Sequence, residues 1–274
     1  MERLHLEQMM PELSRVELSS EEWAKLRLER ANSMPGNLKG YDCPDCLNRG
    51  YSTRIDEYGF EVSVPCHCLK TRASLRAVER SGLKGVLDRL TFETFKTVEP
   101  WQSTLKGAAQ SFVKNSNGAW FYVGGNPGGG KTHICTAICA ELLRSGREVR
   151  YFVWPSDIRR LKTLVNDGEY DSVFDDFADA EVLYIDDLFK ARSAADLTAA
   201  DISRTFELVN RRDQQPEKIT VFSSERNIEE IIRIDEATGS RIFARARGYT
   251  FDLGKSPQRN WRLYGSRPSA AGLK

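Results

Sequence analysis

The pattern of hydrophobic and polar positions changes character near residue 95. From residue 96 onward, short apolar runs alternate with longer amphipathic stretches, as in parallel strands joined by helical crossovers. Right-handed crossovers are the default for such units, so the pattern predicts one compact α/β domain. Its strands are expected at Trp120–Val123, Val149–Val153, Glu181–Ile185, Ile219–Phe222 and Tyr249–Leu253, and its helices at Lys131–Arg144, Ser156–Leu164, Ala199–Arg212, Asn227–Ile232 and Ala237–Arg247.

The part of the chain before residue 96 follows a different pattern. Leu13–Arg30 is charged and has helical spacing, and Ser20 followed by Glu21 and Glu22 is typical of an N-cap with an acidic first turn. The proline and glycines of Asn32–Gly40 are expected to end this helix. We therefore expect an N-terminal helical segment at 1–40, a small module at 41–70, a helical linker at 71–95 and the larger domain at 96–274.

Composition and charge limit the classes of function that this protein can have. The 274 residues include 40 Lys and Arg against 39 Asp and Glu, and a net charge of +1 excludes a strongly basic nucleic-acid coat or an acidic tail. No stretch approaches the roughly 18 uncharged apolar residues of a membrane span, and the first ten residues lack the apolar core of a signal peptide. We expect a cytoplasmic protein without membrane contact, in which clustered cysteines bind metal rather than form disulfides.

A phosphate-binding loop lies between the first predicted strand of the larger domain and its first helix. The letters GNPGGGKT at Gly125–Thr132 match the pattern GxxxxGK[ST] in full. Glycines let backbone amides surround phosphates, and the following helix N-terminus favours anions. Lys131 is expected to reach the β- and γ-phosphates and Thr132 to ligate Mg²⁺. The predicted nucleotide-binding residues of the loop are Gly125, Asn126, Pro127, Gly128, Gly129, Gly130, Lys131 and Thr132.

Polar residues that follow the next strands extend this site. Asp186 and Asp187 come directly after Glu181–Ile185. We expect Asp186 to hold Mg²⁺ and Asp187 to orient or deprotonate the attacking water. Ser224 follows the strand Ile219–Phe222, where a polar residue can sense the γ-phosphate or position water, although Ser-Ser is also an ordinary helix cap. Both interpretations of Ser224 stay open, and its neighbour Glu225 is the alternative sensor.

Two arginines near the end of the domain share one helical face. Arg241 and Arg245 are four residues apart. An arginine presented to the γ-phosphate of a neighbouring subunit would stabilise transition-state charge, whereas a surface arginine would only be solvated. The spacing alone does not choose between these two roles.

Four of the six cysteines form two close pairs, C-P-D-C and C-H-C, separated by nineteen residues. Two such pairs joined by a hairpin-sized loop can enclose one Zn²⁺ in tetrahedral geometry, and alternating apolar residues around a Tyr-Gly turn predict that hairpin. His67, inside the second pair, is a competing ligand. We expect a structural zinc site formed by Cys43, Cys46, Cys66 and Cys68, with Cys135 and Cys139 as core residues of a helix.

Together these motifs resemble the AAA+ helicase loaders of the DnaC/DnaI type, including phage-encoded members. The resemblance spans residues 41 to 265 and is carried by GNPGGGKTH, LYIDDLFK, TVFSSERN, DEATGSRI and the two cysteine pairs. It implies an α/β fold: an AAA+ P-loop NTPase domain with a five-stranded parallel sheet and no full lid domain, preceded by a small zinc-binding domain. It further implies a homo-oligomer in which Arg241 acts in trans, with Arg245 as the alternative.

The function implied by this resemblance is ATP-dependent loading of the replicative DnaB-type ring helicase onto single-stranded DNA. The implied cofactors are ATP, Mg²⁺ and Zn²⁺, and the N-terminal part would engage the helicase. Asp187 replaces the usual Glu of AAA+ proteins, so weak ATPase activity, stimulated by DNA or partner, is expected. The alternatives are an IstB-type transposition-helper ATPase and a nucleotide-gated adaptor with little hydrolysis.

The tail after the last predicted strand has only some 20 residues, which is too short for the usual α-helical lid. Its part Lys255–Arg262 carries Lys255, Arg259, Trp261 and Arg262, a mix of basic and aromatic residues. Such a tail can contact the phosphates and bases of DNA, or it can pack back onto the sheet.

Overall fold

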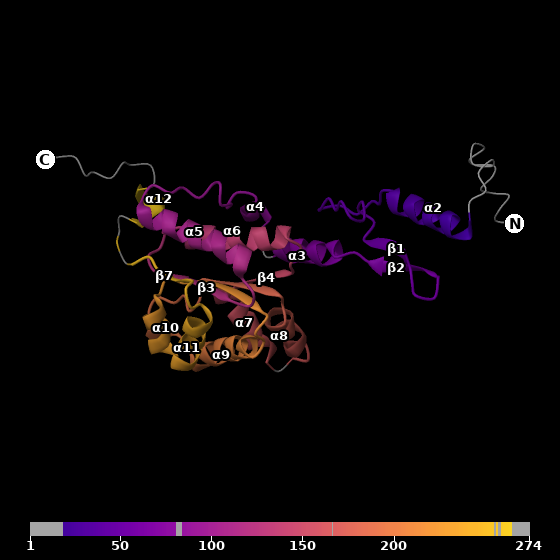
Figure 1. The fold of residues 1–274 in the computed structure, drawn as a ribbon. Coiled ribbons are helices and arrows are strands. Elements are labelled where there is room, and N and C mark those ends of the chain that lie inside the picture. Colours follow the sequence, from indigo (N-terminus) through magenta and orange to yellow (C-terminus); the bar gives the residue numbers. More distant parts are fainter. Residues whose placement is uncertain (1–18, 81–83, 166, 255, 257–258, 265–274) are drawn as a thin grey trace. The chain divides into compact units, whose positions relative to one another are not determined.

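The chain divides into two compact units. The computed structural model describes residues 19–80, 84–165, 167–254, 256 and 259–264 (Figure 1). The N-terminal unit comprises residues 1–69, and the C-terminal unit comprises residues 70–274. The finer division into four parts at residues 40, 70 and 95 stays a prediction.

The N-terminal unit begins, within the described residues, with helix α2, Ser20–Ser33. The N-cap is Ser19 rather than the predicted Ser20, because the Ser19 hydroxyl accepts from the Glu22 amide while the Glu22 carboxylate accepts from the Ser19 amide. The helix also runs three residues past its predicted end at Arg30. Residues 13–18 of the predicted helix lie outside the described part of the chain.

A β-hairpin follows α2, as the alternating apolar residues predicted. Strands β1, Tyr51–Ile55, and β2, Glu61–Pro65, pair antiparallel. Since Val64 pairs with Ser52 and Val62 pairs with Arg54, the two valines of β2 lie on the face opposite to Tyr51 and Ile55. The Asn32 side chain of α2 both donates to the Thr53 carbonyl, at 2.9 Å, and accepts from the Thr53 amide, at 3.0 Å. This pair of hydrogen bonds fixes α2 to β1.

The C-terminal unit is built on a sheet of five parallel strands, which confirms the predicted fold class. The order across the sheet is β4-β5-β6-β3-β7, and every neighbouring pair is parallel. The carboxyl ends of all five strands therefore meet at one edge. The strands are β3, Trp120–Gly124; β4, Val149–Val153; β5, Val182–Asp186; β6, Ile219–Ser223; and β7, Thr250–Asp252.

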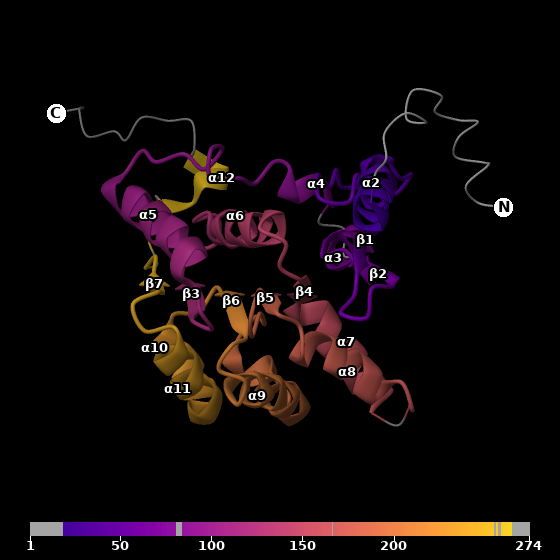
Figure 2. The same ribbon diagram turned by 45° about the vertical axis from the view of Figure 1, so that its right-hand side comes forward.

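Helices cover both faces of this sheet (Figure 2). Helices α5 and α6 lie on one face, and α7 to α11 lie on the other. Two further helices of this unit are short, and α3 begins at the end of the N-terminal unit. The bounds are α3, Cys68–Arg80; α4, Lys84–Leu87; α5, Pro100–Asn115; α6, Lys131–Arg144; α7, Trp154–Leu164; α8, Tyr170–Ala178; α9, Ala199–Asp213; α10, Ile228–Ile234; α11, Glu236–Arg245; and α12, Trp261–Tyr264.

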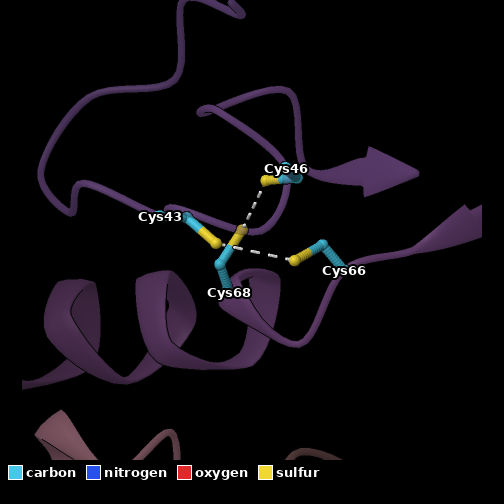
Figure 3. A group of neighbouring side chains, drawn as sticks. All are labelled: Cys43, Cys46, Cys66 and Cys68. Carbon is cyan, nitrogen blue, oxygen red and sulfur yellow. Dashed lines mark hydrogen bonds between the residues drawn. The ribbon is translucent and has the colours of Figure 1, made fainter. Parts of the chain in front are cut away.

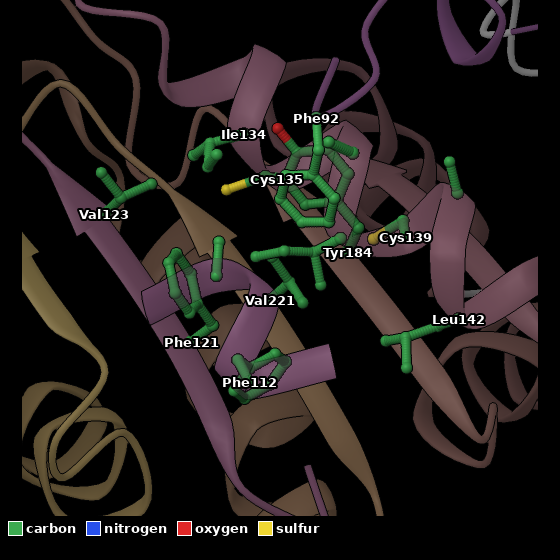
Figure 4. Close-up of a cluster of buried hydrophobic side chains, with 14 of the residues drawn as sticks. Phe92, Phe112, Phe121, Val123, Ile134, Cys135, Cys139, Leu142, Tyr184 and Val221 are labelled. Carbon is green, nitrogen blue, oxygen red and sulfur yellow. The ribbon is translucent and has the colours of Figure 1, made fainter. Parts of the chain in front are cut away.

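The α5 and α6 face contains one of two hydrophobic cores (Figure 4). Phe112 of α5 packs against Phe121 of β3 with ring centroids 5.3 Å apart. Cys135 and Cys139 point from α6 into this core and are buried, and burial raises the pKa of each thiol. These two cysteines are therefore unreactive packing residues.

Helix α7 starts two residues earlier than predicted, at Trp154, and β5 includes Asp186. The second core lies between the sheet and helices α7 to α11, where Phe174 and Phe177 of α8 are buried. After β7, the described residues form the single-turn helix α12. Among the helices that the structure describes, none has both the length and the apolar composition to cross a bilayer.

Candidate nucleotide site and cysteine cluster

The phosphate loop connects β3 to α6 at the carboxyl edge of the sheet. Gly130 is the N-cap of α6 and has a left-handed φ of 82°, and Gly128 has a φ of 75°. A side chain at either position would be strained, since L-residues rarely adopt these angles. The two glycines that the motif specifies are Gly130 and Gly125, which has a φ of 115°, so the observed turn requires both.

Lys131, the first residue of α6, folds back over this loop. Its ammonium donates to the carbonyls of Gly125, at 2.9 Å, and Asn126, at 2.7 Å. The residue is only 6% exposed, and burial lowers the pKa of its ammonium. This places a buried cation at the concave side of the glycine loop, where an anion such as a phosphate can bind.

Asp186 at the end of β5 is the centre of a cluster of hydroxyl groups. Its carboxylate accepts from Thr132, at 3.3 Å, from Tyr184, at 2.8 Å, and from Ser223 and Tyr151. Thr132, Tyr184 and Ser223 share Oδ1 of this carboxylate, and Tyr151 donates to Oδ2. The residue is 6% exposed. Because Thr132 and Asp186 touch, both oxygens can ligate one Mg²⁺, a cation that prefers oxygen ligands.

Tyr151 of β4 and Tyr184 of β5 also reach Asp186, and the sequence pattern did not predict these contacts. Burial and the negative charge of Asp186 raise the pKa of both phenols, so they stay protonated donors. Both lie inside apolar strand runs, where the pattern indicates only core packing. Their sequence carries no signal that could have revealed the contact.

Asp187 directly follows β5 and has a left-handed φ of 58°. Its amide donates to Ser223 Oγ at 3.2 Å, and its carboxylate accepts from Lys190 Nζ at 2.8 Å. The same ammonium lies 3.4 Å from a carboxylate oxygen of Glu225. The structure therefore joins the two acidic residues, which come from separate strands, through one lysine.

Ser224 is fully buried, and its hydroxyl group is already bonded. It donates to the Leu188 carbonyl at 2.8 Å and accepts from the Arg226 amide at 3.1 Å. The first of these bonds connects the end of β6 to the turn after β5. The sensor role of Ser224 stays a prediction, whereas Glu225 is the member of this pair that has a charged partner at the site.

Arg241 and Arg245 of α11 both lie near Asp213, with nitrogen–oxygen distances of 3.6 Å. The Arg245 guanidinium also donates to the carbonyls of Asp213, Gly118 and Pro216 and lies over the Trp120 ring. Arg241 donates to Ala237, inside its own helix, at 2.8 Å and lies over the Phe206 ring. Arg245 thus serves packing within the chain, and the role of Arg241 toward a neighbouring subunit stays a prediction.

The segment after β7 lies against the phosphate loop. The Asn126 amide donates to Gly254 O at 3.0 Å, and its side chain donates to Ser256 O at 2.6 Å. The Trp261 amide donates to Gly128 O, also at 3.0 Å. The described part of this tail therefore packs on the domain, whereas its contact with DNA stays a prediction and Lys255 lies outside the described residues.

Figure 3 shows the four cysteines of the N-terminal unit with their sulfur atoms turned toward one another. The Sγ–Sγ distances are 3.7 Å for Cys43 and Cys66 and 3.5 Å for Cys46 and Cys68, and all four atoms lie within 4.8 Å of each other. Tetrahedral zinc with bonds of 2.3 Å requires sulfurs about 3.8 Å apart. The cluster is therefore compatible with a zinc site.

The surroundings of the sulfurs also fit a cation. Burial raises the pKa of the Cys46 thiol, but the Gly50 amide and the neighbouring cysteines more than offset this, and the resulting pKa is about 6. Burial and the other sulfurs raise the pKa of Cys66 to about 12. Four thiolates this close repel one another unless a cation joins them.

His67 lies at the rim of the cluster. Its Nδ1 is 3.6 Å from Asp45 and 3.8 Å from Cys66 Sγ. The second possible ligand group, Cys43, Asp45 and His67, is more exposed than the four-cysteine group. The geometry therefore favours four sulfur ligands over the predicted alternative with His67.

Comparison with known proteins places this architecture in a family. The chain is 30% identical over 240 residues to the phage-like element PBSX protein XkdC of Bacillus subtilis (strain 168), with 83% of this chain and 88% of that protein covered. It is 27% identical over 198 residues to the replicative helicase loader DnaC of Escherichia coli (strain K12), with 70% of this chain and 76% of that protein covered.

Among solved structures, that of the DnaC helicase loader is 19% identical, has a TM-score of 0.51, and covers 61% of this chain and 96% of its own. This likeness shows the AAA+ fold and agrees with the resemblance predicted from the motifs. Residues 70–234, more than half of the chain, match the family described as IstB-like ATP binding protein. The chain therefore belongs to the IstB-like ATP binding proteins.

Proposed function

We propose that this protein is an ATP-dependent loader of a replicative DnaB-type ring helicase onto single-stranded DNA. The observation that carries the proposal is the contact of Thr132 with Asp186 beside the buried Lys131, in a chain related to a protein named as a helicase loader. ATP binding follows from the family, and loading is the finer step that we infer.

In this proposal the carboxyl edge of the sheet holds Mg²⁺-ATP. Lys131 would bind the β- and γ-phosphates, and the oxygens of Thr132 and Asp186 would ligate the ion. A carboxylate must then take the proton of the attacking water, and the sequence-based prediction assigns this task to Asp187. Arg241 would act on the nucleotide of a neighbouring subunit, so turnover would depend on assembly.

Zinc binding by the four-cysteine cluster is part of the same proposal. The cluster would stabilise the N-terminal unit, which we propose as the helicase-binding part. Elemental analysis of the purified protein should give one zinc per chain. The variant Cys46→Ser should lose most of it, whereas Cys135→Ser, in the core of the C-terminal unit, should retain it. A protein without stoichiometric metal would contradict this assignment.

The loading proposal is tested by light scattering on a sizing column, with the protein mixed with the replicative helicase of its source. We expect a defined complex whose mass changes with ATP. Lys131→Ala should abolish the change while leaving the protein folded. Absence of a complex under every nucleotide condition would overturn the helicase-loader function but not ATP binding, which is measured separately.

A transposition-helper ATPase is the second candidate, because the family match is to the IstB-like proteins. The matched residues 70–234 exclude the four-cysteine cluster, and this N-terminal unit distinguishes the chain from the matched domain alone. Turnover stimulated by duplex DNA and a transposase, rather than by single-stranded DNA and helicase, would favour this second candidate.

A further inference from the structure

Three charged side chains form a cluster at the carboxyl edge of the sheet. The Lys190 ammonium lies 2.8 Å from Asp187 Oδ2 and 3.4 Å from Glu225 Oε1. The side chains are 28%, 37% and 43% exposed for Asp187, Glu225 and Lys190. The cluster is thus partly shielded but open to solvent, as a site of water attack must be.

The turn that carries Lys190 is strained. Asp187 has a φ of 58°, which Asp tolerates, but the buried Phe189 has a φ of 53°, which is rare for a bulky residue. The Lys190 amide closes this turn by donating to the Asp187 carbonyl at 3.0 Å. Such strain persists only where the surrounding structure enforces it and is frequent at functional sites. Here it directs Lys190 back onto Asp187.

The Asp187 carboxylate is already occupied by Lys190. Its Oδ2 accepts from the Lys190 ammonium at 2.8 Å, so one acceptor position on this oxygen is not open to the attacking water. Burial lowers the pKa of Lys190, but the bond to Asp187 more than offsets this and the net pKa is raised. The Asp187 side chain is also one methylene shorter than Glu, and its backbone is fixed by the bond to Ser223.

Glu225 is better placed to accept a proton. It follows β6, which lies between β5 and β3, and so it stands between Asp186 and the phosphate loop along the sheet edge. Its contact with Lys190 is 0.6 Å longer than that of Asp187.

The neighbours of Glu225 hold its backbone in place. The Ser224 hydroxyl donates to Leu188 O, and the Arg226 guanidinium donates to Phe189 O at 3.1 Å. Both bonds join the segment after β6 to the strained turn after β5. Glu225, between them, is therefore carried on a backbone that cannot drift away from Asp187 and Lys190.

We propose that Glu225, rather than Asp187, is the carboxylate that deprotonates the water attacking the γ-phosphate, and that Lys190 is a positioning residue for both carboxylates. This inference rests on the proposed ATPase function. In the step, the water oxygen bonds to the γ-phosphorus, the bond to the β,γ-bridging oxygen breaks, and the water proton passes to Glu225. ADP and inorganic phosphate are the products.

The test compares Glu225→Gln, Asp187→Asn and the surface control Glu229→Gln in the full chain, with Mg²⁺-ATP, single-stranded DNA and helicase present. Glu225→Gln should lower kcat by about 100-fold or more, the usual contribution of a general base, and leave the Kd for ATP within threefold. Asp187→Asn should lower kcat less than tenfold, and Glu229→Gln should match the natural protein.

Lys190 is tested by a conservative pair of variants. Lys190→Met should lower kcat about tenfold at unchanged Kd for ATP, and Lys190→Arg, which keeps the charge, should restore kcat to within threefold. If Lys190 only supported the fold, its replacement would not lower kcat while leaving the Kd for ATP unchanged.

Two results would overturn the assignment in distinguishable ways. If the natural protein turns over ATP, and Asp187→Asn loses at least 100-fold while Glu225→Gln stays within threefold, Asp187 is the base and only this inference fails. If the natural protein binds ATP without turnover under every condition, both the role of Glu225 and the proposed hydrolysis fail.

Discussion

The two ends of the five-stranded sheet both bury charged side chains, but they use them differently. At the amino end, Arg212 is fully buried and donates to the carbonyls of residues 177, 178, 180 and 219 and to the Thr220 hydroxyl. At the carboxyl end, Asp186 accepts from four hydroxyl groups. Each charge is compensated by hydrogen bonds within the chain.

The difference lies in what the partners can do. Backbone carbonyls are fixed by the fold and cannot exchange partners without local unfolding, so Arg212 acts as a permanent connection between α8, α9 and β6. Hydroxyl groups rotate and can release a carboxylate to another partner such as Mg²⁺. The comparison teaches that buried charge at the amino end serves stability, whereas buried charge at the carboxyl end remains available for function.

The largest expected effect is on stability at the amino end. Arg212→Met would leave several carbonyls unpaired and should reduce the free energy of unfolding by about 3–5 kcal/mol. The adjacent Arg211→Met is a matched control, because Arg211 pairs with Asp175 and Asp179 at the surface and should cost below about 1 kcal/mol. Urea unfolding measures both, and equal losses would contradict the buried role of Arg212.

Lys131→Ala tests the role of the carboxyl end of the sheet by its effect on ATP binding. Each hydrogen bond from a charged group contributes about 1.5–3 kcal/mol, so losing the phosphate contacts should raise the Kd for ATP roughly 100-fold. The unfolding free energy should change far less than in Arg212→Met. A fluorescent ATP analogue reports the Kd, with Lys114→Ala of α5 as control. An unchanged Kd would remove Lys131 from the proposed nucleotide site.

Asp186→Asn should weaken Mg²⁺-dependent ATP binding while leaving the free energy of unfolding nearly unchanged. The side chain keeps its shape, and the surrounding hydroxyls can turn to pair with an amide, so the cost in unfolding free energy should stay below about 1 kcal/mol. Without the charge, the Mg²⁺-dependent part of ATP affinity should fall roughly tenfold. Titrations with and without Mg²⁺ measure this part, and an unchanged Mg²⁺ effect would argue against Asp186 as a ligand.

A further moderate effect is expected for the two arginines of α11. Arg245→Met should reduce stability by about 1–2 kcal/mol, because carbonyls of Gly118, Asp213 and Pro216 lose their donor. Arg241→Met should cost less stability but lower ATP turnover in the assembled state. Turnover that survives in Arg241→Met and is lost in Arg245→Met would reverse this assignment.

The sequence predicted the sheet and the phosphate loop because both depend on local patterns. Buried strands are continuous apolar runs, and the loop glycines are needed for left-handed turns at Gly128 and Gly130. The same locality explains the prediction of Asp186, which follows a buried strand, and of the four clustered cysteines.

The contacts that complete the site join distant segments and leave no local signal. Tyr151 and Asp186 are 35 residues apart, and Tyr151 is indistinguishable in the sequence from any other residue of an apolar strand. Lys190 and Glu225 are likewise far apart in the sequence, and they meet only because β5 and β6 are neighbours in the sheet. Arg212 looks like a surface residue at the end of an amphipathic helix, because its partners come from other elements.

The hydrogen bonds between the phosphate loop and the segment after β7 have a consequence for synthesis on the ribosome. The Asn126 side chain pairs with Ser256, 130 residues later in the chain. At roughly 5–20 residues per second, a nascent chain waits on the order of ten seconds between translating the loop and translating its partner. Until then the loop lacks these bonds, so ATP in the cell meets a fully supported phosphate loop only after Ser256 has been translated.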